Sequence, residues 1–184
     1  LPEDFSNKEA ILLQGKGDAL IWCLASSHEG EEELIVEVFQ KLKQHYPHLK
    51  LAIAPRHPER FLTVEALLQS HDLMYKKRSQ TQFEALDFNN ACDVWLFDTI
   101  GELLYLYAAS DIVTVGGSLV PIAGHNILET AYLRKAITVG PYIDNIQDMV
   151  DQFSANDAIA VLAHDALYNQ VENLIMNEEK RSAM

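Results

Sequence analysis

The stretch that decides the fold is DIVTVGGSLVPIAGHNILE, residues Asp111 to Glu129. Its first five residues form a β-branched run that predicts a strand, and the pair Gly116-Gly117 ends that strand. The apolar spacing after His125-Asn126 predicts a helix. A strand, a glycine turn and a helix in this order are typical of an anion site, because glycine permits close approach and a helix start presents unpaired N–H groups. An ordinary tight turn explains the glycine pair equally well.

The same alternation of apolar runs and amphipathic segments extends along the chain. It predicts strands at 19–25, 49–54, 73–77, 93–97, 111–115, 136–139 and 158–162, and helices at 31–46, 58–70, 102–109, from 126 onward, 145–154 and 165–177. Residues 1–18 are predicted to form a loop, and residues 78–90 have no clear period. This order predicts right-handed crossovers and a doubly wound parallel sheet, a Rossmann-like α/β fold in a single domain. Such sheets bind ligands beyond the carboxyl ends of their strands.

Composition and charge argue against several classes of protein. The 184 residues contain 27 Asp and Glu against 14 Lys and Arg, a net charge of −13, which argues against a nucleic-acid-binding protein. Cys23 and Cys92 lack metal-ligand spacing and are predicted to be buried free thiols in a reducing cytoplasm. No apolar run reaches the length of a membrane span, and no signal peptide is present. A start without methionine is typical of a piece of a longer protein.

Polar turns that follow predicted strands are candidates for the site. The turn at 26–30, SSHEG, offers Ser27 and His28 to an anion, or it only caps the next helix. In PRHPER at 55–60, the Arg56 guanidinium fits two oxygens of an anion, although pairing with surface glutamates is the alternative. In DTIGEL at 98–103, Gly101 and Glu102 follow a predicted strand and are candidates for the same ligand-binding edge of the sheet. The alternative is that they only form the start of the next helix.

The fourth turn is the opening stretch. Its candidate residues are Gly116, Gly117, Ser118, Gly124, His125, Asn126 and Glu129. On a helix, His125 and Glu129 would share a face, so that Glu129 could accept hydrogen bonds from two ribose hydroxyls while Asn126 reaches the phosphate. A metal site at His125 and Glu129 is the weaker interpretation, because no third ligand has suitable spacing.

These motifs occur in a fixed order and are followed by GPYIDN, with Gly140, Pro141 and Asn145. Together they resemble the C-terminal half of the bacterial 3-deoxy-D-manno-octulosonic acid (Kdo) transferases, from about Ile21 to Phe153. The family typically has Thr in place of Ser27, Gly-Gly in place of Ala123-Gly124 and Pro in place of Thr130. Ala123 therefore puts a methyl group where a glycine would permit positive φ.

The resemblance implies the C-terminal half of a GT-B glycosyltransferase that moves Kdo from CMP-Kdo to a lipid A precursor, with inversion and without a metal or other cofactor. It implies that this half binds the CMP-sugar. An N-terminal half, absent from this chain, would supply the acceptor groove, the general base and a surface at the cytoplasmic face of the bacterial inner membrane. No catalytic residue is therefore assigned here, and the 184 residues alone are expected to be soluble and inactive.

The family resemblance also implies roles for the candidate residues. Arg56 and the N–H groups at Gly117 and Asn126 are expected to stabilise the departing phosphate, whose negative charge grows as the sugar acquires oxocarbenium-like charge. Glu129 is expected to hold the ribose.

Further roles concern the two ends of the donor. The Gly101 loop and the Gly140-Pro141 turn are expected to frame the cytosine, and Ser27 and His28 are expected to lie toward the sugar. Two alternatives remain open. One is a UDP-sugar transferase or epimerase of the same architecture, and the other is a non-catalytic Rossmann-like interaction module whose glycine turns are purely structural.

Overall fold

The computed structural model describes all residues from Leu1 to Met184. Its strands are β1 (Leu20–Ser27), β2 (Leu49–Pro55), β3 (Tyr75–Lys77), β4 (Val94–Leu96), β5 (Ile112–Val115), β6 (Ala136–Val139) and β7 (Ile159–Val161). Its α-helices are α1 (Phe5–Lys16), α2 (Glu31–Lys43), α3 (Phe61–Ser70), α4 (Leu103–Ala109), α5 (Leu128–Tyr132), α6 (Gln147–Ser154), α7 (Leu167–Met176) and α8 (Glu178–Ala183). Short 3-10 turns are η1 (Pro58–Arg60), η2 (Arg78–Gln80), η3 (Phe83–Ala85) and η4 (His164–Ala166).

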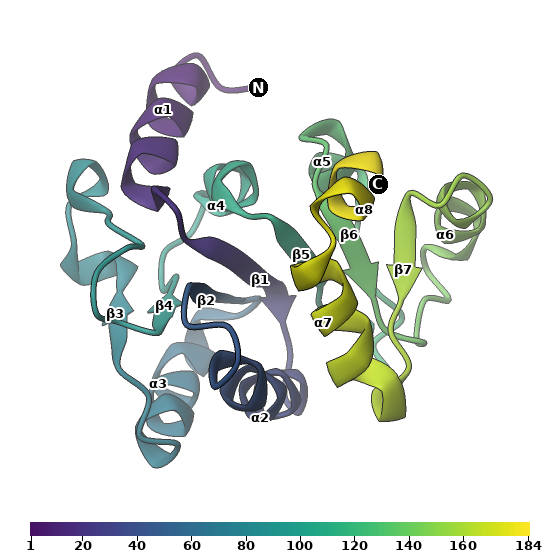
Figure 1. The fold of residues 1–184 in the computed structure, drawn as a ribbon, viewed down its shortest axis with the longest axis horizontal. Helices are drawn as coiled ribbons and strands as arrows, with labels where there is room; N and C mark the ends of the chain where they lie inside the picture. The colour runs from purple at the N-terminus through teal and green to yellow at the C-terminus, as the bar shows by residue number, and fades with distance from the viewer.

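All seven strands form one parallel sheet in the order β3-β4-β2-β1-β5-β6-β7. The sheet crosses the molecule from β3 at one end to β7 at the other (Figure 1). The predicted doubly wound α/β class is confirmed, and the weakly predicted third strand is an edge strand. None of the helices is long and apolar enough to cross a membrane.

Alternate residues of β1 serve the two faces of the sheet. Ile21, Cys23 and Ala25 belong to the core shared with α1, α4 and α6. Trp22 and Leu24 belong to the core shared with α2, α3 and α7. All five are fully buried, which explains why the run reads as continuously apolar rather than alternating.

The chain reverses its direction of winding between β1 and β5. From β1 the strand order runs outward through β2 and β4 to β3, and from β5 it runs the other way through β6 to β7. The loops that leave the carboxyl ends of β1 and β5 therefore separate, and ligands of such sheets bind in the crevice between them. This position makes the loop after β1 and the loop after β5 the parts of the chain closest to a site.

Glycine lets the ends of these two strands touch. A Cβ atom at Gly116 would lie 2.4 Å from the carbonyl oxygen of Ser26, and the Gly116 N–H donates to the Ala25 carbonyl at 2.7 Å. A Cβ atom at Gly140 would lie 2.2 Å from the carbonyl oxygen of Ser118. Because the opposing atoms are main chain and cannot rotate away, both positions need glycine. Ala123 does adopt positive φ, at 78°, as the family's glycine at this position predicts.

Two predicted elements need correction. Residues 1–18 were predicted as a loop, but they contain α1, because Leu12 is fully buried and the Phe5 ring stacks 5.7 Å from that of Tyr105. This helix depends on tertiary contacts that no local period reveals. The helix predicted from Asn126 begins only at Leu128, and the Asn126 side chain accepts a hydrogen bond from the Leu128 N–H at 2.8 Å. His125 and Glu129 therefore do not share a helical face.

Gly116→Ala is expected to lower the free energy of unfolding by about 3 kcal/mol, the upper end for overpacking, because the new methyl group meets main-chain atoms. Urea denaturation measures the change. Gly101→Ala is the matched control, since a Cβ there has no atom within 4 Å and carries only the cost of a φ of +82°. An equal loss in the two variants would contradict the steric explanation.

Candidate ligand-binding site

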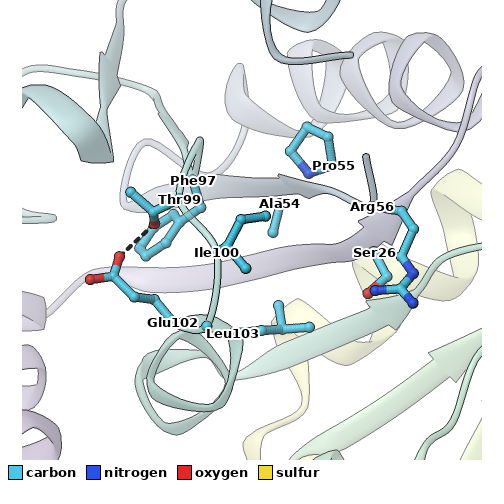
Figure 2. A pocket seen from close by; sticks show the side chains of 10 residues that line it. Ser26, Ala54, Pro55, Arg56, Phe97, Thr99, Ile100, Glu102 and Leu103 are labelled. Carbon is cyan, nitrogen blue, oxygen red and sulfur yellow. Dashed lines mark hydrogen bonds between the residues drawn. The ribbon is translucent and has the colours of Figure 1, made fainter. Parts of the chain in front are cut away.

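A cavity opens at the carboxyl ends of β4, β2 and β1, beside the crevice between β1 and β5. Its lining residues are Ser26, Ala54, Pro55, Arg56, Phe97, Thr99, Ile100, Gly101, Glu102 and Leu103. Figure 2 shows Arg56 and Ser26 at one end, Thr99 and Glu102 at the other, and Ile100 between them. The structure thus brings together the second and third predicted turns.

Arg56 is a cation without an acidic partner. Its neighbour Arg60 pairs with Glu32 at 3.1 Å and with Glu29 at 3.8 Å, but Arg56 makes no ion pair. The alternative interpretation, pairing with glutamates, therefore does not hold for Arg56, and Arg60 pairs with the buried Glu32 as well as with the exposed Glu29. The Arg56 main chain is fixed by a 3.0 Å hydrogen bond from its N–H to the Ser27 carbonyl. The guanidinium is left free to bind an anion in a fork of two hydrogen bonds.

The loop between β4 and α4 offers free main-chain groups to the same cavity. The N–H groups of Thr99, Ile100 and Gly101 donate to no other atom of the chain. The side chain of Glu102 holds the loop, because it accepts from Thr99 at 2.5 Å and from Arg78 at 2.7 Å (Figure 2). Glu102 is thus a support for the loop, and its carboxylate is not available to a ligand.

The glycine loop after β5 is already occupied by a side chain of the protein. Glu31 is fully buried, and its carboxylate accepts hydrogen bonds from the N–H groups of Gly117, Ser118 and Leu119 at 2.9–3.1 Å. It also accepts from the His28 N–H at 2.9 Å. The amides expected to bind phosphate are therefore satisfied internally, and that expectation for Gly117 is wrong. Burial raises the pKa of the Glu31 carboxyl, and the N–H donors oppose this rise.

Ser118, Gly116 and Gly124 are also engaged within the protein. The Gly116 N–H donates to the Ala25 carbonyl. The Ser118 hydroxyl donates to the Val115 carbonyl at 2.5 Å and accepts from the Gly140 N–H at 2.8 Å. Gly124, with φ of +79°, donates its N–H to the Gly117 carbonyl at 2.7 Å. These residues shape the loop and do not present groups to a ligand.

Ser27 lies away from the cavity, contrary to the sequence prediction. It is fully buried, and its hydroxyl donates to Glu32 at 2.9 Å, so it cannot lie toward a sugar or cap α2. The N-cap position of α2 is Gly30. Ser26 lines the cavity instead, because it has a φ of +53° at a break in the strand pairing between Ala25 and Ser27. Nothing in the sequence marks this irregularity.

Three histidines meet beside the cavity. The Nε2 atoms of His28 and His125 lie 2.7 Å apart, and the two rings stack with centroids 5.0 Å apart. The His57 ring packs edge-on against His28 with centroids 5.4 Å apart. The sequence pointed to His28 and His125 but not to His57, because only the fold shows that the ends of β1 and β2 and the loop before α5 converge.

The surroundings of His28 and His125 disfavour their charged forms. Burial lowers the pKa of His28, and the nearby His57, Arg56 and Arg60 lower it further, while Glu32 opposes them. Burial also lowers the pKa of His125, as do His28, Arg56 and His57. These shifts disfavour the charged form of both rings, and the 2.7 Å distance between their Nε2 atoms fits a single N–H···N hydrogen bond.

Other predicted residues lie apart from the Arg56 cavity. Glu129 is exposed and lines a neighbouring apolar groove with Leu1, Pro2, Leu104, Leu128 and Tyr132. Both cavities border the start of α4, since Leu103 lines one and Leu104 the other. The Asn126 side chain accepts from the N–H of Leu128, the first residue of α5. Its own N–H is not at a helix start, because α5 begins at Leu128.

The Gly140-Pro141 turn does not line the cavity that the Gly101 loop borders. Gly101 lies in the loop after β4, whereas Gly140 follows β6, beyond β1 and β5 in the strand order. Asn145 lines a further shallow cavity near the start of α6. That both turns frame one cytosine stays a prediction, and of the two only the Gly101 loop lines the Arg56 cavity. No group of three or more His, Cys, Asp or Glu side chains is arranged to hold a metal ion.

Glu31→Gln is expected to lower the free energy of unfolding by at least about 2 kcal/mol, because an amide replaces a carboxylate oxygen that accepts buried N–H groups. Urea denaturation measures this loss. Glu33→Gln is the matched control, because Glu33 is exposed on the same helical turn. Equal stability of the two variants would show that the buried carboxylate does not organise the loop.

Stability is expected to fall as the pH drops below about 6.5, the usual imidazole pKa. The folded pKa values of His28 and His125 are lowered, so the unfolded chain binds more protons than the folded chain between the folded and unfolded pKa values. Denaturation at pH 7.5, 6.5 and 5.5 measures the slope. His28→Gln combined with His125→Gln should flatten it, whereas His48→Gln, at an exposed position, should not.

Comparison with known proteins identifies the family. No family model matches the chain. The 3-deoxy-D-manno-octulosonic acid transferase of Haemophilus influenzae is 35% identical over 171 residues, which are 92% of this chain and 39% of that protein. The chain thus spans well under half the length of this relative.

Solved structures agree with this relationship. The C-terminal CMP-Kdo binding domain of WaaA from Acinetobacter baumannii has a TM-score of 0.85 and 32% identity, over 95% of this chain and 89% of that domain. The UDP-GlcNAc 2-epimerase of Neisseria meningitidis has a TM-score of 0.59 at 16% identity, over 97% of this chain and 42% of that one, which shows a shared fold alone. The chain therefore belongs to the Kdo transferase family and has the fold of the C-terminal domain of these transferases.

Proposed function

We propose that this chain is a donor-binding domain that holds CMP-Kdo in the Arg56 cavity. The observation that carries the proposal is an unpaired guanidinium beside the switch point of a doubly wound sheet, in a cavity that is also lined by a loop whose main-chain N–H groups are free. The solved Acinetobacter domain, 32% identical, is described as binding CMP-Kdo, and this supports the choice of ligand.

The phosphate is proposed to bind at Arg56 and the adjacent imidazoles. The glycine loop after β5 is closed to it, because Glu31 already accepts from that loop. Cleavage of the bond between sugar and phosphate leaves its electron pair on a phosphate oxygen. The guanidinium of Arg56 beside that oxygen stabilises the growing negative charge. In this scheme the chain stabilises the leaving group by side-chain cations and needs no metal for that purpose.

The cytosine is proposed to lie along the loop between β4 and α4. The free N–H groups of Thr99, Ile100 and Gly101 match the acceptor oxygen and ring nitrogen of a cytosine edge, and the exposed Ile100 side chain offers an apolar contact to its face. Glu129, across the start of α4, is proposed to accept from the ribose hydroxyls. His28 then lies on the sugar side of the phosphate.

The activity of a full-length relative is proposed by extension. Such a protein would transfer Kdo to a lipid A precursor, and the acceptor groove and general base would come from residues outside this chain. No residue of this chain is proposed as the base, because a base must reach the acceptor hydroxyl. Association with the surface of the inner membrane is proposed from the lipid nature of that acceptor.

Arg56→Ala and Glu129→Ala are each expected to weaken CMP binding by on the order of 1.5–3 kcal/mol, the contribution of a hydrogen bond to a charged group. Isothermal titration of CMP into each variant measures the loss. Arg134→Ala is the matched control, because this exposed arginine lies just before the amino end of β6, whereas the cavity lies at the carboxyl ends of the strands. Unchanged affinity in the first two variants would remove those residues from the site.

Comparison of CMP with UDP tests the nucleotide. A specific ligand raises the melting temperature by mass action, so CMP should raise it more than UDP at equal concentration. A larger shift with UDP would favour a UDP-sugar protein of the same fold, and no shift with either would favour a non-catalytic module.

A further inference from the structure

The three-histidine cluster, His28, His57 and His125, lacks the counter-charge that charged imidazoles would need. Glu29 follows His28 in the sequence, and its exposed carboxylate lies 3.8 Å from Arg60. The two buried carboxylates near His28 are already engaged. Glu31 accepts four main-chain N–H groups. Glu32 accepts from the Ser27 hydroxyl and from Arg60.

The other charges around the cluster are positive. Arg56 follows β2 one residue before His57, and Arg60 lies one turn further on. On the side of the β5 loop, His125 contacts Gly117, which carries no charge. The cluster thus combines imidazoles that can accept protons with a guanidinium that attracts anions, and neither buried carboxylate is free to balance them.

We propose that a phosphate binds the three-histidine cluster together with one proton, which the His28–His125 pair accepts. This inference rests on the proposed function and adds His57 to the donor site. The phosphate supplies the missing negative charge, so the charged form of the imidazole becomes favourable only when the ligand is present. The domain therefore binds its nucleotide more tightly as the pH falls through the imidazole range.

The geometry limits the number of protons to one for the pair. The two Nε2 atoms lie 2.7 Å apart, so only one of them can carry the hydrogen that lies between the rings. A second proton on the other Nε2 would place two N–H groups head to head and break the contact. The accepted proton instead occupies a free Nδ1 atom, and the pair becomes one imidazole hydrogen-bonded to one imidazolium.

Titration of CMP in two buffers of equal pH and different ionisation enthalpy counts the protons directly. At pH 7, where CMP is mainly a dianion, the intact chain should take up a number of protons that approaches one for each CMP bound. Between pH 8 and 6.5, the dissociation constant should fall by up to about tenfold per pH unit. Cytidine, which lacks the phosphate, should bind without proton uptake.

Matched variants assign the proton. His28→Gln combined with His125→Gln should abolish the uptake while CMP still binds through Arg56, and His48→Gln should retain it. His57→Gln should weaken CMP binding without abolishing the uptake, because its ring contacts His28 only at an edge. NMR titration of the imidazole C–H signals should show the pKa of His28 or His125 rising when CMP is added.

Failure of this inference is distinct from failure of the proposed function. Equal binding heats in the two buffers, with CMP still bound, would overturn the proton coupling and leave the donor site intact. Uptake that persists in the double variant would assign the proton to another group and would also overturn the inference. If CMP does not bind at any pH between 6.5 and 8, the proposed function itself is wrong.

Discussion

The buried carboxylate of Glu31 is the interaction on which the rest of the site depends. It lies at the first turn of α2, yet it accepts main-chain N–H groups from the loop after β5, more than eighty residues away in the sequence. In many sheets of this class the corresponding loop binds the phosphate of a ligand. Here a side chain of the protein takes that place. The loop is therefore ordered before any ligand arrives, and its order does not have to come from binding energy.

Because the Glu31 carboxylate occupies the loop after β5, the free hydrogen-bond donors lie on the side of the sheet that contains β2 and β4. The amides of the glycine loop are satisfied, whereas those of Thr99, Ile100 and Gly101 have no partner in the chain. Buried or semi-enclosed N–H groups without partners are costly unless water or a ligand satisfies them. The free donors and the free cation both border the cavity between β1, β2 and β4, so hydrogen-bonding requirements alone favour ligand binding there.

The sequence predicts the sheet well because each strand of this fold is a run of apolar residues bounded by polar turns. It predicts the motifs of the site, including His28, Arg56 and the Gly101 loop, because they follow those strands. The sequence does not predict which serine faces the cavity, because this depends on tertiary contacts. A break in strand pairing buries Ser27 and turns Ser26 toward the cavity. No local pattern could show that Glu31 fills the glycine loop, because a glutamate in the first turn of a helix is also an ordinary feature.

The charge of the chain gives this arrangement its selectivity. A protein with a net charge of −13 repels anions at long range, so an anionic ligand needs a place where nearby carboxylates do not compete. Glu31 accepts from four N–H donors and Glu32 pairs with Arg60, so neither of these buried carboxylates pairs with Arg56. Removal of either carboxylate would not simply make the site more positive, because it would free Arg60 or release the loop that holds His28 and His125. Glu31 and Glu32, at the start of α2, therefore bind the glycine loop and Arg60 and leave the Arg56 guanidinium unpaired.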